Sequence, residues 1–162
     1  MVYFVSDIHL GAGSPDEQRG VADRFVGFLR SIEDSATTLI LAGDIFDFWF
    51  EYKHVIPQGY ARTLGQLAQM HDKGIRIIMF TGNHDMWVGD YLTRECGIEI
   101  FTSPQHLSFA GKHLFVAHGD NMNIKGQPTD NECDVPFART TMGGLLVYSP
   151  RHLLRLRQVV EW

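Results

Sequence analysis

The chain has 162 residues, of which 44% are hydrophobic and 20% charged, and its formal net charge is −5 at pH 7. This length suits one compact domain, and the composition is ordinary for a protein that buries a core. The negative charge argues against a nucleic acid as the partner, because phosphate backbones are bound by clustered Lys and Arg. We expect residues 1–120 to form the core domain and residues 121–162 an atypical C-terminal segment.

The start of the chain and its two cysteines indicate a cytoplasmic protein. The first residues, MVYFV, lead at once into Ser6 and Asp7, without the basic start and longer apolar stretch of a signal peptide. No apolar run is long enough to cross a bilayer. Cys96 and Cys133 have neither metal-finger nor CxxC spacing, so we expect reduced thiols.

Four short apolar segments rich in β-forming residues predict buried strands. In chain order they are Val2–Val5, Thr38–Ala42, Ile75–Phe80 and Leu114–Ala117. Helical patterns lie between the first three segments, and this alternation predicts parallel pairing with right-handed crossovers. The expected fold class is therefore a layered α/β domain.

Three helices are predicted between these strands. The first begins at Ser14 with a capping box that includes Glu17, and its apolar face carries Val21, Phe25, Phe28, Leu29 and Ile32. The second covers Gln58–Asp72, and Gly74 fits the position just past its end. A short third helix holds Tyr91 and ends near Gly97.

The later part of the chain predicts an antiparallel addition to the sheet. Glu99–Phe101, Leu107–Phe109 and Lys112–Phe115 have the pattern of short strands, and Ala110-Gly111 is the expected hairpin turn. Residues 121–147 show no clear period. Pro150–Trp162 combines Leu and Val with Arg, which favours an amphipathic helix packed on its own domain.

Each of the four core strands is followed by polar residues that can bind metal ions. The candidate ligands are Asp7, His9, Asp44, Asn83 and His118, and Asp47 and His84 stand in the same motifs. Functional groups in a mostly parallel sheet gather beyond the carboxyl ends of the strands, so we expect these side chains to meet. Oxygen and imidazole donors without a thiolate suit Mn, Fe, Zn or Mg.

This donor set explains how an acidic protein could act on an anionic ester. A bridging carboxylate such as Asp44 can hold two cations roughly 3.5–4 Å apart, and the pair can activate a water molecule for attack at phosphorus. Taken singly, each motif is weak evidence, because a Gly-Asp after a strand is more often a turn. Their joint occurrence in this order is the signal. The other histidines lack such a context and are expected at the surface or in the core: His54, His71, His106, His113 and His152.

The motifs DIH, GDIFD, GNHD and HGD, in this order over about residues 1–120, resemble those of the calcineurin-like metallophosphoesterases. The resemblance implies an αββα sandwich with mixed parallel and antiparallel sheets. The stretches GDIFDFWFEY and GNHDMWVGDYLTRECGIEI are most similar to the branch that hydrolyses UDP-2,3-diacylglucosamine to UMP and 2,3-diacylglucosamine 1-phosphate in lipid A synthesis. That branch implies a UDP-linked glycolipid substrate and peripheral contact with the inner membrane.

The resemblance also implies roles for the matching residues. Asp7 and His9 would bind a first metal, Asp44 would bridge, and Asn83 and His118 would bind a second, with manganese as the expected ion. His84 would act as an acid or electrostatic stabiliser that Asp47 orients. The residues expected to contact substrate are Asn83, His84, Trp49 and Trp87. For the two tryptophans, core packing is an equally good interpretation.

The sequence departs from the family in its last part. The later GHxH-type motif that completes both metal shells is missing, so we expect a C-terminally incomplete fold, truncated or with a changed reading frame near Pro128. Weak metal binding and low activity would follow. Two alternatives stay open. One is another phosphoesterase, such as a phosphodiesterase, a phosphatase or a nuclease. The other is an inactive, metal-poor fragment with exposed core surface.

Overall fold

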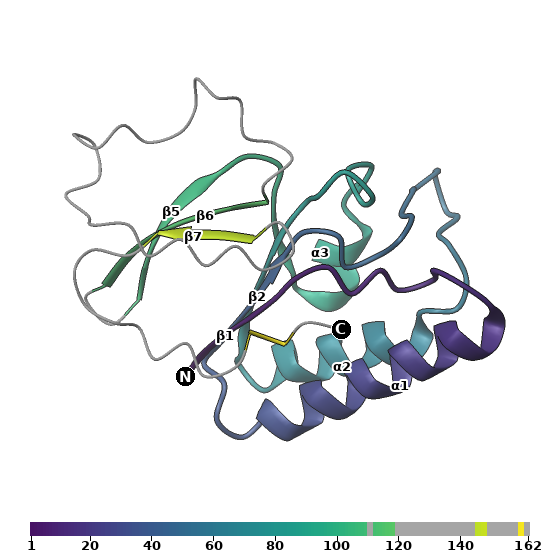
Figure 1. Ribbon diagram of the computed structural model, residues 1–162, viewed down its shortest axis with the longest axis horizontal. Helices are drawn as coiled ribbons and strands as arrows, with labels where there is room; N and C mark the ends of the chain where they lie inside the picture. The colour runs from purple at the N-terminus through teal and green to yellow at the C-terminus, as the bar shows by residue number, and fades with distance from the viewer. Residues whose placement is uncertain (110–111, 119–144, 149–158, 161–162) are drawn as a thin grey trace.

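The structure, a computed structural model, describes residues 1–109, 112–118, 145–148 and 159–160. Figure 1 shows the arrangement of its helices and strands. In chain order they are β1 (Val2–Val5), α1 (Pro15–Ile32), β2 (Thr38–Ala42), α2 (Ala61–Asp72), β3 (Arg76–Phe80), α3 (Tyr91–Cys96), β4 (Glu99–Phe101), β5 (Gln105–Phe109), β6 (Lys112–His118), β7 (Leu145–Tyr148) and β8 (Val159–Val160).

The first sheet is parallel and has the strand order β4-β3-β2-β1-β8. The last residues of its central strands are aligned, because Val5 lies opposite Leu41 and Leu41 lies opposite Met79. The loops that follow β1, β2 and β3 therefore leave the sheet at one edge. The predicted parallel pairing of these strands is confirmed, and their bounds agree with the prediction to within one residue.

The antiparallel strands form a second sheet of order β5-β6-β7, whereas the sequence predicted an addition to the first one. Both faces of the parallel sheet are apolar, so each face needs a cover. Phe4, Ile40 and Phe80 on one face pack against Leu114 and Val116 of the second sheet. The mixed α/β fold with a parallel and an antiparallel sheet, which the family resemblance implies, is thus confirmed.

Helices α1 and α2 cover the opposite face of the parallel sheet, as Figure 1 shows. Side chains from these helices pack against the strands there, among them Phe25, Leu29 and Leu67. The described residues therefore form three layers of helices, sheet and sheet. The outer helical layer expected from the resemblance lies outside the described residues.

The ends of the helices follow local sequence signals. The capping box at Ser14 is present: its hydroxyl accepts the Glu17 N–H, and Glu17 accepts the Ser14 N–H at 2.8 Å. Helix α2 begins at Ala61, three residues later than predicted, because Gly59 has a φ of 100°, which no α-helix accommodates. Gly74, with a φ of 86°, follows the helix end as predicted.

The C-terminal part differs from the prediction where it is described. Val159–Val160 form β8, which pairs with β1, so these two residues are not helical. Leu145–Tyr148 form β7 in a region where no period was visible. The rest of the predicted C-terminal helix and the Ala110-Gly111 turn lie outside the described residues. Within the described part, no helix has the length and apolar character needed to cross a membrane.

Candidate metal centre

Backbone hydrogen bonds join the loop after β1 to the loop after β2. The Asp7 N–H donates to the Gly43 carbonyl at 3.1 Å, and the His9 N–H donates to the Asp44 carbonyl at 3.0 Å. This pairing continues the parallel register of the two strands beyond their ends. It places the side chains from both loops at the same edge of the sheet.

Three of the predicted ligands have strained backbones. Asp7, His9 and Asp44 have φ values of 55°, 50° and 52°, and only one other non-glycine residue in the described part has a positive φ. This left-handed region costs a non-glycine residue roughly 1–3 kcal/mol and is common at functional sites. The hydrogen bonds between the loops hold this strained backbone and keep the three side chains at the same edge of the sheet.

His118 reaches the same point from the second sheet. The sequence placed it beyond a parallel strand, but β6 is antiparallel and lies in the other layer. Its Nδ1 lies 3.0 Å from the Ala42 carbonyl oxygen, which only accepts, so Nδ1 carries the proton. The lone pair is then on Nε2, which lies 3.5 Å from Asp44 Oδ2. Gly43 permits this approach, because a Cβ there would overlap the His118 ring.

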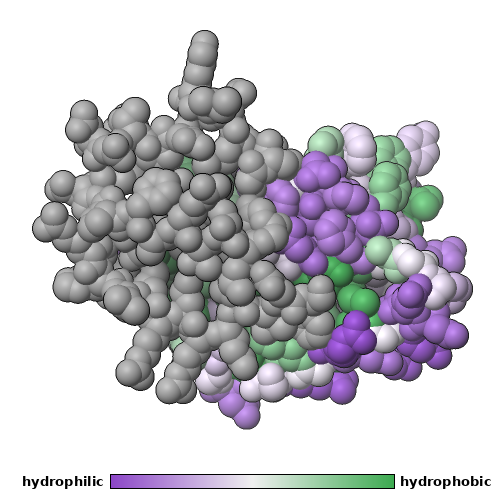
Figure 2. All heavy atoms as spheres, in the orientation of Figure 1, coloured by the Kyte–Doolittle hydropathy of each residue, from purple (hydrophilic) through white to green (hydrophobic). Residues whose placement is uncertain are grey.

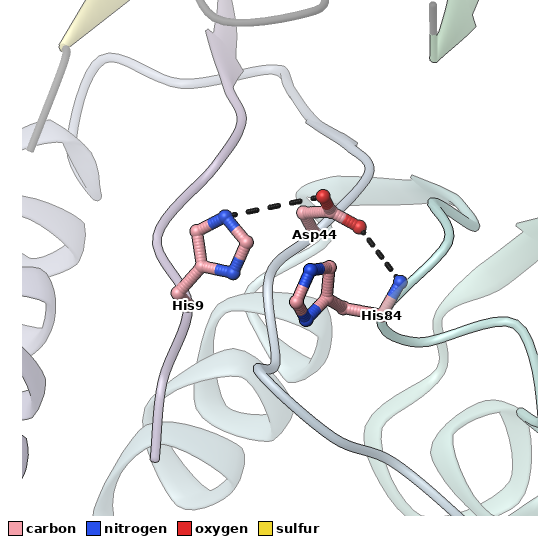
Figure 3. A group of neighbouring side chains, drawn as sticks. All are labelled: His9, Asp44 and His84. Carbon is pink, nitrogen blue, oxygen red and sulfur yellow. Dashed lines mark hydrogen bonds and ion pairs between the residues drawn. The ribbon is translucent and has the colours of Figure 1, made fainter. Parts of the chain in front are cut away.

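His9, Asp44 and His84 surround a second point, shown in Figure 3. His9 Nε2 lies 3.9 Å from Asp44 Oδ2, and the His84 N–H donates to Asp44 Oδ1 at 3.0 Å. The two imidazole rings meet edge to face, with centroids 4.7 Å apart. Gly82 permits this packing, because a Cβ there would overlap the Asp44 carboxylate.

Asp47 contacts both of these histidines. Its Oδ1 lies 3.5 Å from His9 Nδ1 and 3.4 Å from His84 Nδ1, and its carbonyl accepts a hydrogen bond from His84 Nδ1 at 2.9 Å. The bond to this carbonyl, assisted by the charges of Asp44 and Asp47 and opposed by burial, raises the pKa of His84. The protonated form of the ring is therefore favoured.

The donor atoms form two groups that share one carboxylate. One group contains Asp7, Asp44 and His118, the other contains His9, Asp44 and His84, and within each group the donor atoms lie within 4.8 Å of one another. The resemblance instead paired Asp7 with His9. Asn83, the remaining predicted ligand, is exposed on the turn after β3.

The chemistry of these residues fits a pair of divalent cations. Asp7 Oδ2 is the one buried side-chain nitrogen or oxygen without a hydrogen-bond partner in the described part of the chain. A buried oxygen of this kind is costly unless a cation or a donor satisfies it. Carboxylates and imidazoles around a shared Asp44 are the donors that Mn, Fe or Zn prefer.

Comparison with known proteins identifies the family of the chain. A model of the calcineurin-like phosphoesterase family matches residues 1–141. The chain belongs to the calcineurin-like phosphoesterase family. A solved structure of a protein of unknown function from Aquifex aeolicus matches with a TM-score of 0.42 and 23% identity over 73% of this chain and 60% of that one.

Several curated relatives within this phosphoesterase family are UDP-2,3-diacylglucosamine hydrolases. The protein from Porphyromonas gingivalis is 40% identical over 74% of this chain and 45% of its own length. The protein from Pseudomonas aeruginosa is 30% identical over 94% of this chain and 59% of its own length. The chain thus spans about half the length of the curated relatives that it matches.

The two tryptophans beside the phosphoesterase motifs have different environments. Trp49 is fully buried, packs against Phe46, and donates from Nε1 to Glu51, so it has the core-packing role. Trp87 is 52% exposed, and its ring centroid lies 5.9 Å from that of Phe48. Trp87 is therefore accessible to a substrate, as the expected contact requires, whereas Trp49 is not.

Phe48, Phe50 and Trp87 form an exposed aromatic surface that the sequence-based reasoning did not assemble. Phe50 and Trp87 are joined by an isolated β-bridge. In Figure 2 hydrophobic side chains gather at the upper right, over the loops after β2 and β3. The sequence signal for this surface was the alternation Phe-Trp-Phe from residue 48. Alternate residues of an extended segment point to opposite sides, so the two Phe rings lie on the side opposite to the Trp ring.

Asp85 is a further residue at the site that sequence reasoning missed. It has no exposed surface, and its carboxylate accepts backbone N–H groups from Ile45, Phe46 and Gly82. Burial raises the pKa of Asp85, while these three N–H donors oppose that shift. The signal was its place at the end of GNHD, in a loop that carries predicted ligands.

Proposed function

We propose that this chain is the metal-binding core of a hydrolase that cleaves the pyrophosphate of UDP-2,3-diacylglucosamine, giving UMP and 2,3-diacylglucosamine 1-phosphate. The observation that carries the proposal is the sharing of Asp44 by two donor groups. Family membership supports the hydrolase class, and the names of the relatives support the substrate. The substrate is thus inferred from proteins about twice as long.

In this proposal Asp7, His9, Asp44, Asn83 and His118 hold two divalent cations, with manganese expected. When bound, such a pair supplies a Lewis acid and lowers the pKa of a water molecule that can attack phosphorus. The protein keeps the donors in place before metal arrives. The Nδ1–H of His118 is fixed by the Ala42 carbonyl, so the lone pair of Nε2 faces Asp44 and could bind a cation there.

His84 is proposed as the residue that donates a proton. Its Nδ1 is held by the Asp47 carbonyl, so Nε2 is the atom that can give a proton to an oxygen leaving phosphorus. The raised pKa of His84 makes its ring easier to protonate than a free imidazole, and we propose that this ring faces the phosphate, which leaves His9 and Asp44 as the metal ligands of the second donor group. Asp47 orients the ring, and its carboxylate also contacts His9.

The aromatic surface of Phe48, Phe50 and Trp87 is proposed to receive the acyl chains of the substrate. The three side chains are 45–54% exposed and lie on the loops that carry Asp47 and His84. Burying such rings against hydrocarbon is favourable by roughly 25 cal/mol per Å² of apolar surface. A lipid substrate would call for peripheral membrane contact, as the family resemblance implies, and the cytoplasmic location stays a prediction from the sequence.

The test is manganese-dependent release of UMP from UDP-2,3-diacylglucosamine by the 162-residue chain. Asp44→Ala should abolish release, because both donor groups lose their shared member. Asp23→Ala, which removes an exposed carboxylate from α1, should leave release unchanged.

Two outcomes would count against the proposal in different ways. Manganese binding without UMP release would favour another phosphoester as the substrate. Failure to bind manganese would contradict the metal centre, and would agree with the inactive-fragment alternative.

A further inference from the structure

The carboxylate of Asp85 is a buried charge that binds backbone N–H groups of two loops. Its Oδ2 accepts from Ile45 at 2.8 Å and from Phe46 at 3.3 Å, and its Oδ1 accepts from Gly82 at 2.7 Å. Hydrogen bonds to an ionised acceptor are roughly twice as strong as neutral ones. Because an unpaired buried charge is costly, these three bonds hold the two loops at a fixed separation.

The two loops are the ones that carry the candidate ligands. Ile45 directly follows Asp44, and Gly82 directly precedes Asn83. The bond from the His84 N–H to Asp44 Oδ1 crosses the same gap at 3.0 Å. Asp85 therefore lies beneath the point where the loop after β2 meets the loop after β3, and its bonds fix the distance between their donor atoms.

We propose that Asp85 is a positioning residue that sets the separation of Asp44 from the Asn83–His84 turn, and thereby sets the affinity of the centre for divalent cations. Asp85 is no ligand itself, because it is fully buried and both of its oxygens accept N–H groups. The inference rests on the proposed function, since it takes the groups around Asp44 as metal sites. Loss of partners that orient ligands typically weakens metal binding by about 10–100-fold.

Manganese titration of the 162-residue chain, followed by calorimetry, tests this role without requiring activity. In Asp85→Asn the side chain keeps its shape, but its NH₂ group cannot accept a hydrogen bond, so one of the two loops loses its acceptor. We expect manganese to bind about 10–100-fold more weakly to this variant than to the wild type. Thermal melting without metal, recorded in parallel, shows whether the variant is folded.

Gln66→Leu is the matched control. Gln66 is also buried and polar, but it binds Arg30 and Glu33 between α1 and α2. A purely structural loss there should lower the melting temperature and leave manganese affinity unchanged. If folded Asp85→Asn binds manganese within about twofold of the wild type, the proposed role of Asp85 is wrong. If the wild type itself binds no manganese, the result contradicts the proposed function and not the role of Asp85 in particular.

Amide hydrogen exchange of the wild type keeps the inference testable if Asp85→Asn does not fold. The hydrogen bonds that Ile45 and Gly82 donate to Asp85 should protect both amides from exchange before metal is added, and manganese should change their exchange little. Rapid exchange that slows only with manganese would mean that the metal, and not Asp85, orders the loops. That result would overturn the proposal.

Discussion

His118 Nδ1 lies 3.0 Å from the carbonyl oxygen of Ala42, a residue 76 positions earlier in the chain. This contact joins the end of β6 in the antiparallel sheet to the end of β2 in the parallel sheet. It turns an imidazole that belongs to one layer toward a carboxylate that belongs to the other. The candidate metal centre therefore depends on the packing of the two sheets, and not on the parallel sheet alone.

Gly43→Ala should disturb this junction. A Cβ at Gly43 would overlap the His118 ring, and the backbone there has a φ of 93°, which an alanine adopts only with strain. We expect the variant to lose about 1–3 kcal/mol of unfolding free energy and to bind manganese more weakly. Urea denaturation and metal titration measure the two effects.

Gly27→Ala is the control for that substitution. Gly27 is exposed in α1, and nothing lies within 4 Å of a Cβ placed there. Alanine should stabilise the helix by about 0.5–1 kcal/mol and leave metal affinity unchanged. Equal effects of the two substitutions on manganese binding would contradict the assigned contact between Gly43 and His118.

Asp7→Asn should separate stability from metal binding. Asp7 Oδ2 is buried without a partner in the described part of the chain, so removing its charge should leave the metal-free protein as stable as the wild type or up to about 1 kcal/mol more stable. The stabilisation that added manganese provides should shrink, because a ligand oxygen is lost. Melting temperatures with and without manganese measure this. A large loss of stability in the metal-free variant would show that Asp7 has a structural role.

The sequence predicted β1, β2, β3 and α1 closely for clear physical reasons. Strands buried on both faces read as continuous apolar runs, and the capping box marks the start of α1 at Ser14. The start of α2 was predicted too early because Gly59 and Tyr60 carry no standard capping signal. The two-residue strand β8 pairs with β1 through contacts distant in sequence, which local patterns do not contain.

The site was predictable as a set of residues but not as a geometry. The order of Asp7, Asp44, Asn83 and His118 at segment ends was visible, because polar residues interrupt apolar runs there. Asp44 was predicted to bridge, but the pairing of Asp7 with His118 around it was not visible, because that pairing depends on positive φ angles and on the approach of a second sheet. The buried Asp85 is part of a visible motif, yet only the fold shows that its partners lie 39 and 40 residues earlier.

The acid sensitivity of the chain should depend in part on Glu33. Its carboxylate accepts hydrogen bonds from Gln66 and Gln69 and lies 2.7 Å from Lys73 Nζ, which ties α1 to α2. The hydrogen bond from Lys73 is the largest effect and lowers the pKa of Glu33 below its ordinary value near 4.5; burial opposes this shift, and the charge of Lys73 and the two amides add to it.

The sign of this linkage follows from the lowered pKa. Between the folded pKa and the ordinary value, the unfolded chain binds more protons, so stability falls as the pH falls. The contribution is fully present above about pH 4.5 and is lost as the pH drops through the folded pKa. In Glu33→Gln the unfolding free energy should therefore decline less steeply between about pH 5 and pH 3. Lys73→Met should give a similarly shallow slope, whereas slopes parallel to the wild type would exclude this role.

Phe48→Ser and Trp87→Ser should raise the KM for UDP-2,3-diacylglucosamine if the aromatic surface receives its acyl chains. Each ring is about half exposed, and losing roughly 1.5 kcal/mol of apolar contact corresponds to about a tenfold change in binding. The kcat should change less, because neither side chain belongs to the donor groups around Asp44. Val55→Ser removes a side chain that is 65% exposed but lies outside the aromatic surface, and it should leave KM unchanged. Equal KM values for all three variants and the wild type would show that the acyl chains bind elsewhere.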